Sequence, residues 1–182
     1  EIAGKKFEKT IKLDGTSMTI FWHENQIGVC GRNWQLKESE SNLLWRVAKE
    51  KKIIAALEAI KQSLAFQGEL IGPGIQGNHE KLPAHDFYLF NVWDINKQKY
   101  FSARERQDLI NKLDLLGFNI KQVPSEGYID FSADITVEEI LKMAEGKSLW
   151  AQEREGLVFK RADGIFSFKA IANSYLKKHA DR

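Results

Sequence analysis

Near the start of the chain, hydrophobic and polar positions alternate with a period of two. Within the stretch 7–36, Met18, Ile20 and Trp22 alternate with polar partners, which is typical of a strand with one buried face. The polar segment 24–26 separates this run from a second apolar run at 27–30. The pattern predicts a β-hairpin within a region of strands and turns.

The period becomes helical between residues 42 and 64. The apolar residues that can share one helical face are Leu43, Val47, Ile54, Leu57 and Ile60. The charged residues between them fall elsewhere, as on an amphipathic helix.

Two more helices are marked by capping boxes, in which a residue and the third residue after it bond each other's backbone N–H groups. Ser102 with Glu105 opens the first, and Thr136 with Glu139 opens the second. Glycines close both, so the expected helices span 102–117 and 136–146.

Short apolar runs predict the remaining strands, at 66–71, 87–95, 156–160 and 165–170. The glycine-rich segment 72–78 predicts a loop, and Asp163-Gly164 predicts a turn between the last two strands. We therefore expect residues 1–182 to form one α+β domain with antiparallel sheets.

Composition narrows the classes of protein. With 182 residues the chain has room for one well-packed domain. Cys30 is the only cysteine, which excludes an internal disulfide and favours a reducing, intracellular setting. A formal charge of +2 is too small to attract nucleic acid through bulk electrostatics. We expect no membrane partner, because no apolar run approaches the roughly 18 residues that span a bilayer.

The segment Lys12-Leu13-Asp14-Gly15 carries the most specific chemistry. A lysine can attack phosphorus only without its proton, and a free lysine side chain has a pKa of about 10.4. Burial or nearby cations must therefore prepare such a nucleophile. The alternative interpretation is a solvated lysine at a hairpin turn.

Phosphoryl transfer also needs cations on the phosphates and a divalent metal. Arg32, Lys160 and Lys169 are candidates for the first role. Candidate metal ligands, directly or through water, are the carboxylates of Asp14, Glu69 and Glu155. A base would need an aromatic slot, and the strand 87–95 holds Phe87, Tyr88, Phe90 and Trp93, of which most are expected to be core.

The order of these segments resembles a known family. After Lys12-Leu13-Asp14-Gly15 come Gly31-Arg32-Asn33, Gln67-Gly68-Glu69-Leu70, 87–94, Glu155-Gly156-Leu157-Val158-Phe159-Lys160 and Phe166-Ser167-Phe168-Lys169. This run resembles the nucleotidyltransferase domain of ATP-dependent RNA ligases, of the deinococcal type with a separate N-terminal OB-fold domain. The resemblance implies antiparallel sheets flanked by helices, with a nucleotide cleft between the sheets. Because the chain lacks an initiator methionine and that OB-fold domain, we expect it to be a piece of a longer protein.

The resemblance also implies a reaction. Lys12 would attack ATP with Mg²⁺ or Mn²⁺ present, forming a lysine–AMP intermediate. AMP would pass to the 5′-phosphate of an RNA, and a 3′-hydroxyl would then displace it, at nicks in RNA repair, editing or tRNA healing.

The roles implied for single residues follow the motifs. Glu69 would contact the ribose, and Trp93, or else Phe90, would stack on adenine. Asp14, Glu69 and Glu155 would bind the metal through water. Lys160 and Lys169 would contact the nucleotide phosphates, and Arg32 a phosphate of ATP or of the RNA end.

Two positions depart from the family pattern. Ile11 stands before the lysine where such ligases often have an acidic residue, and Ser167 stands where some RNA ligases have a second lysine. The alternatives are a DNA ligase, an mRNA-capping guanylyltransferase, or a non-catalytic protein that binds nucleic-acid ends.

Overall fold

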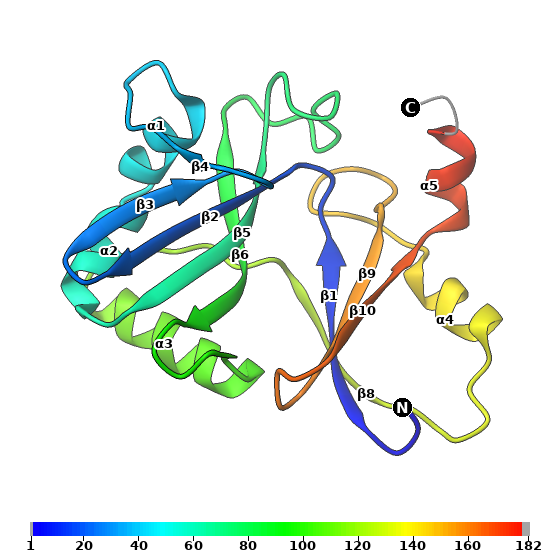
Figure 1. Cartoon of the computed structure of the whole chain (residues 1–182). Coiled ribbons are helices and arrows are strands. Elements are labelled where there is room, and N and C mark those ends of the chain that lie inside the picture. The colour runs from blue at the N-terminus through cyan, green and yellow to red at the C-terminus, as the bar shows by residue number, and fades with distance from the viewer. Residues whose placement is uncertain (1, 180–182) are drawn as a thin grey trace.

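Two antiparallel sheets make up the framework of the computed structural model, which describes residues 2–179 (Figure 1). The four-stranded sheet, in the order β10-β9-β1-β8, consists of β1 (Lys6–Lys12), β8 (Ser125–Asp130), β9 (Gly156–Arg161) and β10 (Ser167–Ile171). The six-stranded sheet, in the order β4-β3-β2-β5-β6-β7, consists of β2 (Thr16–His23), β3 (Gln26–Cys30), β4 (Gln35–Leu36), β5 (Leu64–Ile71), β6 (Asp86–Asp94) and β7 (Lys99–Tyr100). The predicted α+β class with antiparallel sheets is confirmed.

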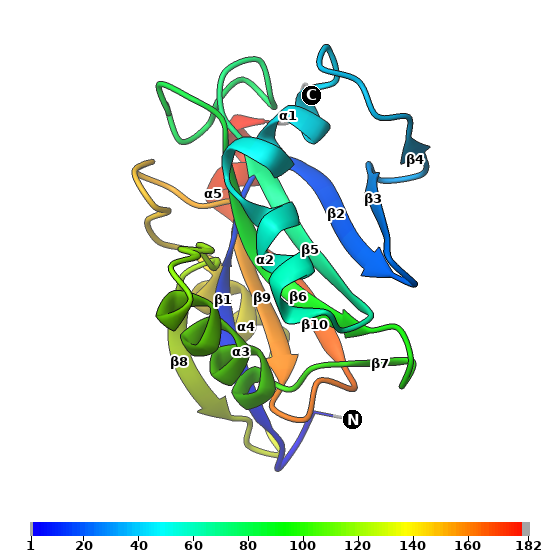
Figure 2. The ribbon, with the colours of Figure 1, turned by 90° about the vertical axis from the view of Figure 1, so that its left-hand side faces the viewer.

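The helices lie on the outer faces of the sheets. They are α1 (Leu43–Glu50), α2 (Ile53–Ile60), α3 (Ala103–Leu115), α4 (Val137–Ala144) and α5 (Asn173–Lys178). Figure 2 shows α1 and α2 in front of β5 of the six-stranded sheet, whereas α4 and α5 accompany the four-stranded sheet. Within residues 2–179, no helix combines the length and the apolar composition needed to cross a bilayer.

Each sheet has its own hydrophobic core. Met18 and Phe66 of the six-stranded sheet are fully buried and belong to the cluster that includes Leu57 of α2. Phe7 and Phe159 of the four-stranded sheet belong to a second cluster that includes Tyr175 of α5. The second cluster also includes Ile71 of β5 and Tyr88 of β6, so apolar packing connects the two sheets.

Local sequence signals located most elements correctly. The predicted hairpin is confirmed, with Ile20 of β2 opposite Val29 of β3. Both capping boxes are also confirmed, at Ser102 and at Thr136. The single helical segment predicted for 42–64 is wrong: the chain breaks between α1 and α2, and residues from Leu64 onward belong to β5.

Candidate functional site

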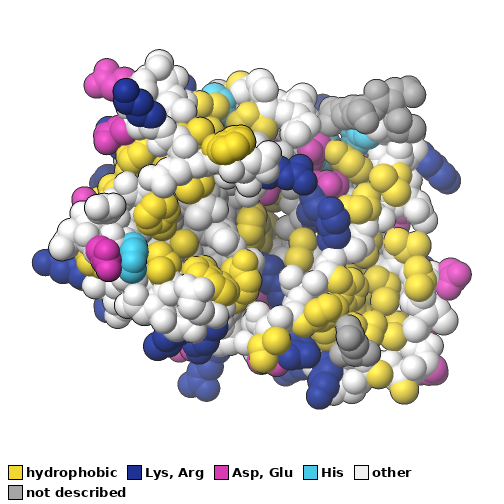
Figure 3. All heavy atoms as spheres, in the orientation of Figure 1, with side chains coloured by type: hydrophobic (Ala, Val, Ile, Leu, Met, Phe, Trp, Pro, Cys, Tyr) yellow, Lys and Arg dark blue, Asp and Glu magenta, His cyan; other side chains and the backbone are white. Residues whose placement is uncertain are grey.

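Lys12 is the last residue of β1 and lies where the two sheets meet. Its Nζ is 2.6 Å from Oε2 of Glu155, and both side chains are only partly exposed. The backbone brings them together because Lys12 pairs with Gly156, the first residue of β9. A Cβ at Gly156 would lie 2.0 Å from the backbone oxygen of Ala170, so only glycine lets β9 and β10 approach here. Figure 3 shows Lys and Arg side chains beside Asp and Glu side chains near the middle of this face.

A cavity of about 270 Å³ opens beside Lys12. Its lining residues are Thr10, Ile11, Lys12, Leu13, Glu69, Phe90, Asn91, Val123, Val158, Lys160 and Ser167. Both sheets contribute, since Glu69 lies on β5 and Phe90 on β6, whereas Lys12 and Lys160 lie on β1 and β9. The lining combines apolar side chains with polar and charged groups, which suits a flat base joined to a phosphate-bearing sugar.

Three carboxylates surround Lys12. The pKa of Glu69 is raised to about 7, chiefly because its carboxylate is buried. The positive charge of Lys12 opposes this shift, and the negative charges of Glu155 and Asp14 add to it. Asp14 accepts a hydrogen bond of 2.6 Å from the hydroxyl of Tyr175, a residue of α5 that sequence reasoning did not select. In the part of the chain that the structure describes, no group of three or more His, Cys, Asp or Glu side chains could hold a metal ion directly.

The buried Glu69 gives a testable pH dependence of stability. Between pH 4.5 and about 7 the folded state holds a proton on Glu69 that the unfolded state has lost. The stability that protonated Glu69 contributes is fully present below pH 4.5 and is lost as the pH rises through about 7. We expect Glu69→Gln to match the parent near pH 4 and to be more stable at pH 7.5, measured by urea unfolding. Glu58→Gln, an exposed change on α2, is the control. An equal difference at both pH values would contradict the assignment.

Lys160 lies at the other end of the cavity from Lys12. It pairs with Glu8 on β1, four residues before Lys12, so the two backbone positions are about 13 Å apart along the strand. Lys160 is 8% exposed, and its Nζ donates a hydrogen bond to the backbone oxygen of Phe90. The pKa of Lys160 is lowered to about 7, chiefly because its amine is buried. The positive charge of Arg106 adds to this shift, and the negative charge of Glu8 opposes it. Lys160 therefore occupies the opposite end of the cavity from Lys12, and its expected contact with a nucleotide phosphate stays a prediction.

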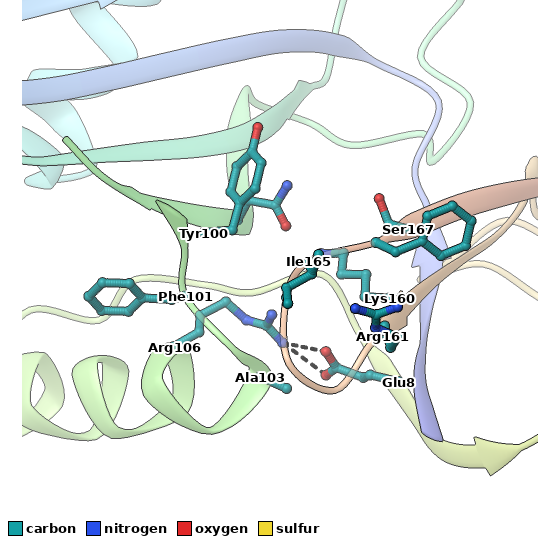
Figure 4. Close-up of a pocket in the computed structure, with 12 residues that line it drawn as sticks. Glu8, Tyr100, Phe101, Ala103, Arg106, Lys160, Arg161, Ile165 and Ser167 are labelled. Atoms are coloured by element: carbon teal, nitrogen blue, oxygen red, sulfur yellow. Dashed lines mark hydrogen bonds and ion pairs between the residues drawn. The ribbon is translucent and has the colours of Figure 1, made fainter. Parts of the chain in front are cut away.

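A smaller cavity of about 120 Å³ lies behind Lys160 (Figure 4). Asn91, Lys160 and Ser167 line both cavities. In the smaller one, Nη2 of Arg106 on α3 donates to both carboxylate oxygens of Glu8, at 2.9 and 2.7 Å. Both side chains are more than nine-tenths buried. The pair therefore joins α3 to β1 inside the molecule.

The geometry of the cavity favours Phe90 over the expected Trp93, and which ring stacks on adenine stays a prediction. Trp93 packs edge-on against Tyr100, with ring centroids 4.7 Å apart, and is not among the residues that line the cavity. Phe90 and its neighbour Asn91 both line it. Gln67 pairs with Asn91 and Gly68 with Leu89, so Phe90 is an extra residue in β6 that interrupts the alternation. Asn91 was missed because strict alternation would send it to the opposite face from Phe90.

Two predicted phosphate contacts lie outside this lining. Arg32 is exposed in the turn after β3, and Lys169 is exposed on β10. Lys169 is two residues from Ser167 and so shares its face of β10, beside the larger cavity. Both cations are exposed to solvent, and of the two only Lys169 is placed beside the larger cavity by its strand position.

Comparisons with known proteins agree with this geometry. A sequence model of the family described as RNA ligase matches residues 5–174. A solved structure of a Naegleria gruberi RNA ligase mutant with ATP and Mn has a TM-score of 0.95 and 50% sequence identity, covering 100% of this chain and 54% of that one. The structure of the same ligase with PPi has a TM-score of 0.95 and 51% sequence identity, and the match covers 99% of this chain and 53% of that one. A search of curated proteins found no match.

A ligand-free mutant of the Naegleria gruberi RNA ligase also superposes with a TM-score of 0.95 at 51% identity, covering all of this chain and 53% of that one. The chain thus spans about half the length of these solved relatives. The family match extends over nearly every element from β1 to the start of α5. The chain belongs to the RNA ligase family.

Proposed function

We propose that this chain is the nucleotide-binding, catalytic part of an ATP-dependent RNA ligase. The observation that carries the proposal is the Lys12–Glu155 contact of 2.6 Å at the edge of a cavity of about 270 Å³. The relatives' structures with ATP and Mn and with PPi support the choice of nucleotide.

The first step is attack by Lys12 on the α-phosphorus of ATP. The new N–P bond replaces the bond to the β-phosphate oxygen, and pyrophosphate leaves. Glu155 lies within hydrogen-bond distance of Nζ and is placed to take the proton that the amine must lose. The AMP is then held on Lys12 with its base directed along the cavity toward Lys160.

Two further transfers complete the proposed reaction. The 5′-phosphate oxygen of an RNA attacks the AMP phosphorus, which frees Lys12 and leaves a 5′–5′ pyrophosphate link. A 3′-hydroxyl then attacks the RNA phosphorus, forming the phosphodiester bond and releasing AMP. We propose that the ends meet at nicks and that an OB-fold domain of the longer protein assists in holding them.

Oxygen ligands fit a hard divalent cation that keeps several of its waters. Asp14, Glu69 and Glu155 would hold Mg²⁺ or Mn²⁺ through such waters, in line with the absence of a direct three-ligand cluster among the described residues. The cation supplies positive charge that offsets the charge on the transferring phosphoryl group. Lys169 and Arg32, both exposed to solvent, would contact phosphates.

The direct test is incubation with Mg²⁺ and ATP labelled on the α-phosphate, followed by denaturing electrophoresis. Label bound covalently to the protein, and removed by added pyrophosphate, is the expected result. GTP labelled in the same way should give none. Label from GTP alone would instead indicate a capping enzyme, and no label from the folded chain would contradict the proposed first step.

Phe90 is proposed to stack on adenine. Base–aromatic stacking is worth about 1–3 kcal/mol, so Phe90→Ala should raise the KM for ATP about 5- to 150-fold. Trp93→Ala, which removes a ring outside the cavity, should leave the KM within about twofold. The rate of lysine–AMP formation against ATP concentration measures both. The reverse ranking would restore Trp93 as the stacking residue.

A further inference from the structure

Another hollow, of about 340 Å³, lies next to the reaction centre. Three segments form it: the loop between β5 and β6, the segment before β9, and α5, all at the same end of the molecule (Figure 1). The side chains that matter here are His79, Lys81, Trp150, Glu153, Lys178 and His179. We call this hollow the Trp150 cavity.

Trp150 is held in place although its ring is largely in water. The side chain is 58% exposed. The buried carboxylate of Glu80, 2% exposed, accepts hydrogen bonds from the backbone N–H of Trp150 at 2.9 Å and of Ala151 at 3.1 Å. It also accepts one from the hydroxyl of Ser148. A large aromatic side chain on a fixed backbone outside the core is suited to bind a flat partner without a large loss of entropy.

Exposed cations near Trp150 can bind an anionic partner. Lys81 and Lys178 line the cavity; Lys178 pairs with Glu153, and the buried Glu80 carboxylate is hydrogen-bonded to the backbone N–H groups of Trp150 and Ala151. His79 and His179 add two imidazole rings that can donate hydrogen bonds. A phosphodiester beside a base matches this combination of cations and an exposed indole.

The Trp150 cavity is connected to the proposed catalytic residues by short contacts. A ring nitrogen of His79 lies 2.8 Å from the backbone oxygen of Glu153, two residues before the Glu155 that pairs with Lys12. The ring of His79 also packs edge-on against Tyr175, with centroids 5.6 Å apart. The Tyr175 hydroxyl in turn binds Asp14, two residues after Lys12. A chain of contacts therefore connects the Trp150 cavity to the segment that holds Lys12.

We propose that the Trp150 cavity binds an unpaired segment of the RNA strand that is being joined, outside the nick, with a base on Trp150 and the backbone beside Lys81 and Lys178. This inference rests on the proposed ligase function and adds where the RNA strand binds. An exposed aromatic ring beside lysines recognises the shape of a nucleotide rather than a sequence, as a ligase that joins unrelated RNA ends requires.

The test measures binding of a fluorescently labelled, 5′-phosphorylated single-stranded RNA by anisotropy, with no ATP present. Trp150→Ala should weaken binding about 5- to 150-fold, as expected for the loss of one base stack. Lys81→Gln should weaken it and lower the slope of log affinity against log salt by about 0.7, the value for one phosphate on a single strand. Transfer of AMP to the same RNA should show a raised KM for RNA in both variants.

Tyr128→Ala is the matched control, because Tyr128 on β8 is 51% exposed and has Lys6 over its ring at 5.2 Å. It should bind RNA as the parent does. Lysine–AMP formation from ATP should be unchanged in Trp150→Ala, so that a failure of the RNA site is separate from a failure of the ligase reaction. Parental RNA affinity in Trp150→Ala, or an equal loss in Tyr128→Ala, would overturn the proposal.

Discussion

Lys12→Ala is expected to lower covalent labelling by α-labelled ATP at least about a thousandfold, because the substitution removes the atom that forms the N–P bond. The side chain occupies one edge of the larger cavity and contacts Glu155. Because the side chain is partly exposed, its truncation should leave the fold intact. Labelling after acid quench, with thermal unfolding measured in parallel, separates loss of chemistry from loss of structure.

Lys9→Ala is the matched control for this result. Lys9 lies on the same strand but on the opposite face from Lys12, since alternate residues of a strand face opposite ways. Its replacement should leave the labelling rate within about twofold. Strong labelling that persists in Lys12→Ala would show that another nucleophile serves the reaction.

Arg106→Met is expected to lower the free energy of unfolding by about 3–5 kcal/mol, because it leaves the Glu8 carboxylate buried without its charged partner. Glu8 is 5% exposed and Arg106 is 7% exposed, so the carboxylate left behind would be poorly solvated. Urea unfolding at pH 7 measures the change. The double variant Glu8→Leu with Arg106→Met should recover much of the loss, because it removes both charges.

The control for Arg106 lies two residues away on the same helix. Arg104 faces solvent and approaches Asp108 at 3.9 Å, with side-chain exposures of 92% and 70%. Exposed pairs of this kind contribute about 0–1 kcal/mol, so Arg104→Met should change stability little. Equal losses in Arg104→Met and Arg106→Met would show that the buried pair has no special role.

Local chemistry in the sequence was enough to place several elements. The capping boxes at Ser102 and Thr136 involve residues only three positions apart, so their helices start where the sequence predicts. The break between α1 and α2 was not predictable in the same way. Lys52 there has φ 57°, a left-handed conformation without the glycine or asparagine that usually signals it. Packing of both helices on one sheet outweighs that local preference.

The sequence predicted which residues form the candidate site better than it predicted how their side chains are arranged. Motif order placed Lys12, Glu69 and Glu155 in one site, and the cavity confirms that Lys12 and Glu69 line it together. The extra residue at Phe90 depends on how β6 pairs with β5 and leaves no mark in its own sequence. The hydrogen bond from Tyr175 to Asp14 joins residues 161 positions apart, which no local pattern encodes.

The Glu8–Arg106 pair also governs how the two sheets are aligned. Together with the bond from Lys160 to the backbone of Phe90, it connects β1 and β9 on one side of the cavity to α3 and β6 on the other. Apolar contacts tolerate sliding, whereas hydrogen bonds have a preferred length and direction. Directional bonds therefore fix the distance between the two sheets at the Lys160 end of the cavity, four residues along β1 from Lys12.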